Sequence, residues 1–465
     1  CTMIVTCRMN MMRVAGTIFA WGTSNADVHF CIINISYCSI SSCSCRMECI
    51  MVIAHAMGRT LVVPPRENLY LLDKKQNNQK KAPLGFDDFF DIDLLKSHRG
   101  YHVISTEEFL RTEGQAGGLH GVLPPKNRTD LAGGVLHKYL RKVADELPAW
   151  RGKFLVMPDV NTDLSSFNQS MVSSLPATVR DRMKKFGGER SPVFYDKKLV
   201  NAHHVHFQNG PDHRLLQHHY AFSFFANKDM QSFYRRFVRD YLRYKDEIQC
   251  AGDEILRLVR ADAIAHNTKN NFVDRPKDAF YALHIRRGDF QFKEVKLGAE
   301  DIVKNLVVDG KSVIPPGALV YVSTDDPKGL CKGCRVQAIP CEKYEKGKKP
   351  PGCPEDTSWD AFRRAGWTVK FLDDYLAKGA LQGVNTNVYG MVESIVCSKS
   401  TVFAGTYFST FSGYIHRMRG YHGLGEETYY HSARHVLFAR MKKSVGHGFS
   451  REWRAGWTDD EGAPI

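Results

Sequence analysis

The sequence predicts an α/β fold with two parallel sheets, and two stretches of the chain carry this prediction. Residues 46–65 contain a buried helical pattern, then a glycine, then a short strand. After residue 275, short apolar runs alternate with helical patterns. Strands that alternate with helices form parallel sheets, because each parallel pair needs a long crossover connection. Each half of the chain is therefore expected to supply one α/β unit.

The first of these stretches reads "RMECIMVIAHAMGRTLVVPP". Its apolar residues recur at helical spacing as far as Gly58, and glycine is typical of the end of a helix. "TLVV" follows as a strand, which Pro64 and Pro65 end because proline has no backbone N–H to offer a sheet. A helix that leads into a parallel strand implies that another strand precedes Arg46.

Residues 1–45 differ from the rest of the chain in composition. Cysteine, methionine and serine are crowded there, and neither a helical nor a strand period is sustained. We interpret residues 1–45 as an atypical N-terminal segment. No stretch of the chain reaches the roughly 18 apolar residues that a membrane-spanning helix requires, so no membrane anchor is visible.

The middle of the chain contains one strongly amphipathic helix. In "FYRRFVRDYLRYKDEI", Phe233, Phe237 and Tyr241 are spaced four apart and form one apolar stripe opposite a basic face. We expect this helix to pack on a core between the two units.

Two motifs in the first half resemble metal sites but are interpreted otherwise. Asp91 and Asp93 in "FDDFFDIDLL" have the D-x-D spacing that binds a divalent ion in some enzymes, yet they alternate with Phe and Leu. We read them as part of a helix or turn. His203, His204 and His206 lack helical ligand spacing, and no third ligand accompanies the pair that would share one face of a strand. No metal site is expected at either motif.

The second half of the chain shows strands with polar residues at their ends. The strand-like runs are "FYALHI", "ALVYVS", "TVKFL" and "TVFAG", and "NVYGMVESIVCS" has a helical period between them. Ligands of parallel α/β sheets bind beyond the carboxyl ends of the strands. Three polar clusters fall at such ends: "HIRRGD", "STDD" and "GTYFSTFSG".

The cluster "HIRRGD" is the most specific of the three. On a strand, His284 and Arg286 point to the same side, so both are expected to face a ligand. Arg287 is expected to pair with Asp289 as support. A guanidinium group offers a planar set of donors that matches phosphate oxygens. The alternative is a buried Arg–Asp pair with a structural role only.

The other two clusters suit the remaining parts of a nucleotide. Asp325, directly after a strand, can accept hydrogen bonds from ribose hydroxyls or a purine base; the alternative is a turn or helix-cap aspartate. Ser409 or Thr410 stands at the start of a helix, where free backbone N–H groups and a partial positive charge attract phosphate; the alternative is ordinary capping. Together the clusters predict a site for a nucleoside diphosphate between two α/β units, without a metal.

The charge of the chain agrees with an anionic ligand but does not identify it. There are 64 Lys and Arg residues against 50 Asp and Glu, a formal net charge of +14. Such an excess favours acidic partners. No nucleic-acid-binding module accompanies the lysine-rich segments, so nucleic acid is not an expected partner.

A cysteine-rich loop and three sequons bear on the cellular compartment. Cys331, Cys334, Cys341 and Cys353 could bind zinc or form two disulfides. The N-x-S/T triplets are compatible with a secretory route, and they begin at Asn34, Asn127 and Asn168.

The motifs, taken in order, resemble those of the GDP-fucose protein O-fucosyltransferase family. The segments "RMECIMVIAHAMGRTLVVPP", "HIRRGDF", "STDD" and "NVYGMVESIVCSKSTVFAGTYFSTFSGYIHRMRG" carry the resemblance, which spans roughly residues 46–420. It implies a GT-B fold, in which two Rossmann-like domains face a central cleft. It also implies an inverting, metal-independent transfer of fucose from GDP-fucose to a hydroxyl of a protein or glycan, with no cofactor, in the lumen of the Golgi or endoplasmic reticulum.

The resemblance assigns roles to individual residues. Arg286 matches the catalytic arginine that contacts the donor diphosphate and assists departure of the leaving group. His284 and Asp325 match positions near the nucleoside. The loop that holds phosphate and base corresponds to Ser409, Thr410 and Phe411, and the supporting residues are Arg46, Arg287 and Asp289.

The resemblance also implies a division into domains. Residues 46–255 correspond to the N-terminal, acceptor-side domain, residues 256–440 to the C-terminal domain that binds the GDP-sugar, and residues 441–465 to a tail. The family carries a turn rich in glycine and asparagine just before the arginine that matches Arg46, where this chain has "ISSCSC". Two alternatives stay open. The polar clusters read the diphosphate and not the sugar, which leaves a rhamnosyl- or mannosyl-type transferase that uses another nucleotide sugar, and the missing glycine turn suggests a non-catalytic member that binds nucleotide or glycan.

Overall fold

The computed structural model describes residues 30–33, 40–66, 84–98, 101–114, 145–146, 149–159, 161–207, 218–288, 290, 292–326, 359–432 and 458. Several predictions concern residues outside these ranges. They are the roles of Asp289, of the loop that contains Cys331, Cys334, Cys341 and Cys353, and of the sequons at Asn34 and Asn127. No helix in the described ranges is long and apolar enough to cross a membrane.

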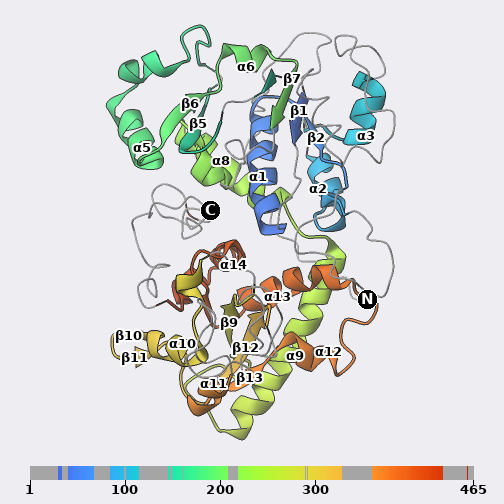
Figure 1. Ribbon diagram of the computed structural model, residues 1–465, viewed down its shortest axis with the longest axis vertical. Helices are drawn as coiled ribbons and strands as arrows, with labels where there is room; N and C mark the ends of the chain where they lie inside the picture. The colour runs from blue at the N-terminus through green and yellow to red at the C-terminus, as the bar shows by residue number, and fades with distance from the viewer. Residues whose placement is uncertain are drawn as a thin grey trace, which may run out of the picture.

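The N-terminal half contains a five-stranded parallel sheet in the order β3-β2-β1-β7-β4. Its strands are β1 (Phe30–Ile33), β2 (Thr60–Val63), β3 (Val103–Ser105), β4 (Asp145–Glu146) and β7 (His204–Phe207). Helix α1 (Ile40–Ala56) connects β1 to β2, as the helix–glycine–strand pattern predicts. The short helices α2 (Ile92–Ser97) and α3 (Thr106–Phe109) lie beside this sheet (Figure 1).

The strand predicted to precede Arg46 is β1, and it lies at the centre of the sheet between β2 and β7. Within the segment interpreted as atypical, residues 30–33 form this strand and residues 40–45 begin α1. The segment "ISSCSC" stands where the family resemblance implies a glycine-rich turn. In this structure it forms the beginning of helix α1. A helix start rich in serine and cysteine has weak helix propensity, which is why the sequence did not reveal the first turns of α1.

A second, three-stranded parallel sheet completes the N-terminal half, in the order β6-β5-β8. Its strands are β5 (Lys153–Met157), β6 (Ser191–Phe194) and β8 (Ser223–Phe225), and the helices of this region are α5 (Ala177–Gly187), α6 (Lys197–Asn201), α7 (His219–Phe222) and α8 (Lys228–Tyr241). The amphipathic prediction for α8 is confirmed, because Phe237 and Val238 are 2% exposed.

The C-terminal half contains the second five-stranded parallel sheet, in the order β13-β12-β9-β14-β15. The strands are β9 (Tyr281–Ile285), β12 (Leu319–Thr324), β13 (Thr368–Lys370), β14 (Val402–Gly405) and β15 (Thr428–Tyr430), with a small hairpin of β10 (Val307–Val308) and β11 (Lys311–Ser312). The four strands predicted in this half are confirmed. The chain runs outward from β9 in one direction and from β14 in the other, so the boundary between them is the switch point at which such sheets bind ligands.

The helices of the C-terminal half are α9 (Asp246–Lys269), α10 (Ala299–Asn305), α11 (Asp360–Arg364), α12 (Leu372–Leu376), α13 (Tyr389–Ser398) and α14 (Thr410–Tyr421). Helix α9 packs against α13 and α12 (Figure 1). The predicted division between residues 255 and 256 falls inside α9, which is continuous there.

One hydrophobic core cluster joins the two halves. It includes Met47 and Ile50 of α1 together with Tyr321 of β12, Phe403 of β14 and Ile415 of α14. Two α/β units with parallel sheets confirm the predicted fold class, and the shared core shows that the units meet through packed apolar side chains.

Candidate functional site

The carboxyl ends of β9 and β14 are tied together by Thr406, the residue that follows β14. Its hydroxyl accepts a hydrogen bond from the backbone N–H of Arg286 (2.9 Å) and donates to the carbonyl of His284 (3.1 Å). Thr406 is fully buried. The first residue after β9 is therefore fixed at the switch point of the sheet.

The next residues of the loop are fixed by Asp325, which follows β12. Its Oδ1 accepts from the N–H of Arg287 and its Oδ2 from the N–H of Gly288, both at 2.8 Å. The same Oδ2 lies 3.3 Å from Nε of Arg286. A Cβ at position 288 would lie 2.3 Å from Oδ2, so only glycine permits this approach. Asp325 thus positions the loop, and its predicted contact with a nucleoside stays a prediction.

The two adjacent arginines have different surroundings. The side chain of Arg286 is 23% exposed. Arg287 is 3% exposed, and its guanidinium carbon lies 3.9 Å above the centre of the Trp359 ring, a cation–π contact. Of the two, Arg286 is the more exposed, while Arg287 holds the loop against the start of α11.

His284 lies beneath the first turn of α14 rather than exposed beside Arg286. It is 5% exposed, its Nδ1 is 2.7 Å from Oγ of Ser412, and its ring lies 4.6 Å from the ring of Phe411. Burial, and next the charge of Arg286, hold the pKa of His284 well below its usual value of 6.5. At neutral pH this imidazole is therefore uncharged, and it supports the helix that carries Phe411.

Helix α14 begins as predicted, with Ser409 as its N-cap. The Ser409 hydroxyl accepts from the N–H of Ser412 at 3.5 Å, and Phe408 just before it has a φ of +64°, which is rare for a residue with a side chain. A Cβ on Gly405 would lie 2.5 Å from Oγ of Ser412, so glycine lets α14 pack closely on β14. Thr410 and Phe411 are partly exposed in the first turn. The N–H of Ser409 donates to the carbonyl of Thr406, a residue that also binds the backbone of Arg286, so α14 begins next to the β9–β14 switch point.

Some residues of this region were not predicted from the sequence. Thr406 could have been found, because it directly follows a predicted strand. Ser412, Trp359 and Glu393 carry no local signal. The pKa of Glu393 is raised to about 8, mainly by burial, and its carboxylate lies 3.5 Å from the hydroxyl of Tyr321.

Arg46, predicted as a supporting residue, is 2% exposed on α1. Its supporting role stays a prediction.

The two motifs that resemble metal sites in the sequence have structural roles. Asp91 is the N-cap of α2 and accepts from the N–H of Leu94 at 2.9 Å, while Asp93 pairs with Lys96 on the surface. This confirms the interpretation as a helix start. His204 and His206 are buried in β7. Within the described ranges, no group of His, Cys, Asp or Glu side chains is arranged to hold a metal ion.

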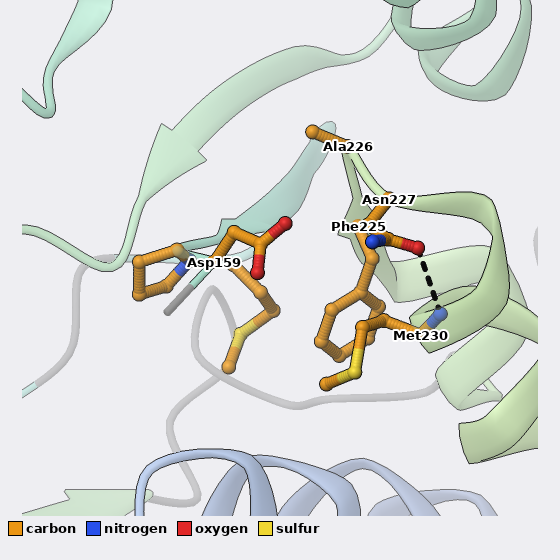
Figure 2. A pocket seen from close by; sticks show the side chains of 7 residues that line it. Asp159, Phe225, Ala226, Asn227 and Met230 are labelled. Atoms are coloured by element: carbon orange, nitrogen blue, oxygen red, sulfur yellow. Dashed lines mark hydrogen bonds between the residues drawn. The ribbon is translucent and has the colours of Figure 1, made fainter. Parts of the chain in front are cut away.

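A small pocket lies at the carboxyl ends of β5 and β8 (Figure 2). It is partly open to solvent and is lined by Met157, Pro158, Asp159, Phe225, Ala226, Asn227 and Met230. Asn227 caps α8 by accepting from the N–H of Met230 at 3.2 Å. None of the predicted donor-binding residues lines this pocket.

Comparisons with known proteins identify the family. The model of the family described as GDP-fucose protein O-fucosyltransferase matches residues 46–304, more than half of the 465 residues. None of the curated proteins compared with the chain matches it.

Among solved structures, the chain is similar to POFUT1 in complex with GDP-fucose, with 11% identity, a TM-score of 0.34, and coverage of 88% of this chain and 100% of that one. It is also similar to NodZ α-1,6-fucosyltransferase soaked with GDP-fucose, with 12% identity, a TM-score of 0.34, and coverage of 84% and 92%. A third match is fucosyltransferase NodZ from Bradyrhizobium, with 10% identity, a TM-score of 0.35, and coverage of 84% and 94%. The family match, which includes the Arg286 loop, decides the assignment: the chain belongs to the GDP-fucose protein O-fucosyltransferase family of glycosyltransferases.

Proposed function

We propose that this protein transfers fucose from GDP-fucose to a hydroxyl of a protein or glycan acceptor, with inversion at the anomeric carbon. One observation carries the proposal: Arg286 is partly exposed and fixed at the β9–β14 switch point, beside the N-terminus of α14. Cationic and backbone donors that converge at such a point are suited to a diphosphate.

The proposed roles follow from charge. As the bond between fucose and GDP breaks, negative charge grows on the departing diphosphate. Arg286 would stabilise that charge with its planar donors, and the N–H groups at Thr410 and Phe411 would add to it. These groups are held in advance by Thr406, Asp325 and the Ser409 cap, so little reorganisation is needed during the reaction.

We further propose that the donor site works without a metal ion or other cofactor. The arginine and the helix start supply positive charge where a divalent cation would otherwise be needed. Turnover, measured as GDP release in the presence of acceptor, should then survive a brief pulse of a strong chelator. Immediate loss of activity, restored by manganese, would contradict the metal-free proposal.

The acceptor side and the compartment are also proposals. The N-terminal half would bind the acceptor, as the family resemblance implies. We place the reaction in the lumen of the secretory pathway. The exposed sequon at Asn168 is compatible with that compartment.

Calorimetric titration with GDP, GDP-fucose and UDP tests the donor assignment directly. We expect GDP and GDP-fucose to bind, and UDP to bind at least about tenfold more weakly, a difference of about 1.4 kcal/mol. A preference for UDP would overturn the donor assignment. Binding of GDP-fucose without turnover on any protein or glycan acceptor would instead favour the non-catalytic alternative.

A further inference from the structure

A buried ion pair connects the two halves of the protein. The guanidinium Nη2 of Arg417, on α14, donates to Oε1 of Glu48, on α1. The two residues are 369 positions apart in the chain, and their side chains are 2% and 0% exposed. Solvent water therefore does almost nothing to stabilise either charge.

The surroundings of this pair are polar but enclosed. His218, the N-cap of α7, places its Nδ1 2.9 Å from Oε2 of Glu48, and Nδ1 of His219 lies 3.5 Å from the same oxygen. The rings of Tyr414 and Tyr220 lie 5.0 Å and 5.9 Å from the Arg417 guanidinium carbon. Burial raises the pKa of Glu48, but Arg417 and His218 outweigh this and lower it well below its ordinary value. Burial lowers the pKa of His219 to about 4. At neutral pH, Glu48 is thus ionised and His219 is uncharged.

The ion pair includes a residue of α14, the helix that begins at the proposed donor site. Arg417 follows Thr410 by seven residues, so both lie on the same face of α14, roughly 10 Å apart along its axis. The far end of α14 is fixed to its own half by Arg419, whose guanidinium donates to the carbonyls of Ser400, Leu424 and Glu427 at 2.6–3.1 Å. Arg417 therefore connects α14 to the N-terminal half.

We propose that Glu48 is a positioning residue for the donor site: through Arg417 it sets how α14, and with it the N–H groups at Thr410 and Phe411, is oriented against Arg286. This proposal rests on the proposed function, because it assigns donor phosphate to the start of α14. Glu48 does not touch the donor; it lies in α1, and its carboxylate is taken up by Arg417 and the two histidines.

The energetics make the effect measurable. Removing one partner of a buried pair leaves the other charge uncompensated, which is strongly unfavourable. Glu48→Gln has nearly the same shape and removes only the charge, so Arg417 is expected to shift toward another acceptor or water. Because α14 carries both Arg417 and the N–H groups at Thr410 and Phe411, we expect a change in how Arg417 is held to change where those groups lie.

The test compares GDP binding in matched variants by calorimetry. Glu48→Gln removes the charge, and Arg417→Lys keeps a charge but loses the planar fork. Met183→Ala serves as the control, because Met183 is buried in a separate apolar cluster on α5. It should lower the melting temperature without affecting α14. All binding is measured well below the lowest melting temperature of the set.

We expect Glu48→Gln and Arg417→Lys to weaken GDP binding by at least about tenfold, or about 1.4 kcal/mol, while Met183→Ala binds as the unmodified protein does. Glu48→Asp should recover part of the loss because it restores the charge. The KM for GDP-fucose should rise with the dissociation constant of GDP.

The proposal is overturned if both pair variants fold and bind GDP normally, or if Met183→Ala loses as much affinity as they do. Should Glu48→Gln fail to fold, Arg417→Lys decides alone. A separate result concerns the proposed function: if the unmodified protein binds neither GDP nor GDP-fucose, that function fails, and the positioning role fails with it.

Discussion

At the scale of single residues, the two adjacent arginines can be separated experimentally. Arg286→Lys replaces a planar fork by a point charge at the proposed leaving group, so we expect turnover to fall by about 2–4 kcal/mol of transition-state stabilisation. Arg287→Lys keeps the charge but loses the stacking on Trp359, so it should lower the melting temperature and change turnover less. Steady-state kinetics and thermal unfolding of both variants measure these effects. Equal kinetic losses would show that the two side chains do not have distinct roles.

Only some of these residue roles could be predicted from the sequence. Alternation along a strand separated Arg286 from Arg287, because that rule is local. It could not supply Trp359, which stands 72 positions after Arg287, nor the contact between Glu48 and Arg417. Such contacts depend on how helices pack across the fold, and no short sequence motif predicts them.

At the scale of elements, the loop after β9 depends on the strand beside it. In Asp325→Asn, one acceptor oxygen becomes an NH₂ group that would face a backbone N–H of Arg287 or Gly288. A buried donor left without its acceptor costs about 1–3 kcal/mol, so we expect a loosened loop and a comparable loss in kcat/KM. Asp301→Asn, exposed on α10, is the matched control and should behave normally. Unchanged kcat/KM in Asp325→Asn would mean that the loop keeps its shape without the carboxylate.

The elements around this loop were largely predictable, and those of the first sheet were not. β9, β12, β13 and β14 are apolar runs bounded by polar residues, a strong strand signal. β1 is as central as β9 in its sheet, yet its four residues lie in a segment crowded with cysteine, methionine and serine that sustains no period. Local patterns therefore identify a short strand only where the neighbouring elements also show a clear period.

At the scale of the whole molecule, the shared core predicts cooperative unfolding. Because Met47 and Ile50 of α1 pack in the same cluster as Phe403 and Ile415, neither half can lose its structure without exposing the other's apolar surface. Differential scanning calorimetry should give a single transition, and GDP should shift that transition as a whole. Two resolved transitions, with only one shifted by GDP, would show that the halves unfold independently.

The same core limits how this protein can be engineered. If the chain were cut before α9, each of the two fragments would expose an apolar face that is buried in the intact protein. Exposed apolar faces of this kind promote aggregation. Exchanging the N-terminal half for that of a relative would require redesigning the contact between α1 and α14 at the same time. The two halves are therefore best treated as one unit, and substitutions of exposed side chains change either half without disturbing the core they share.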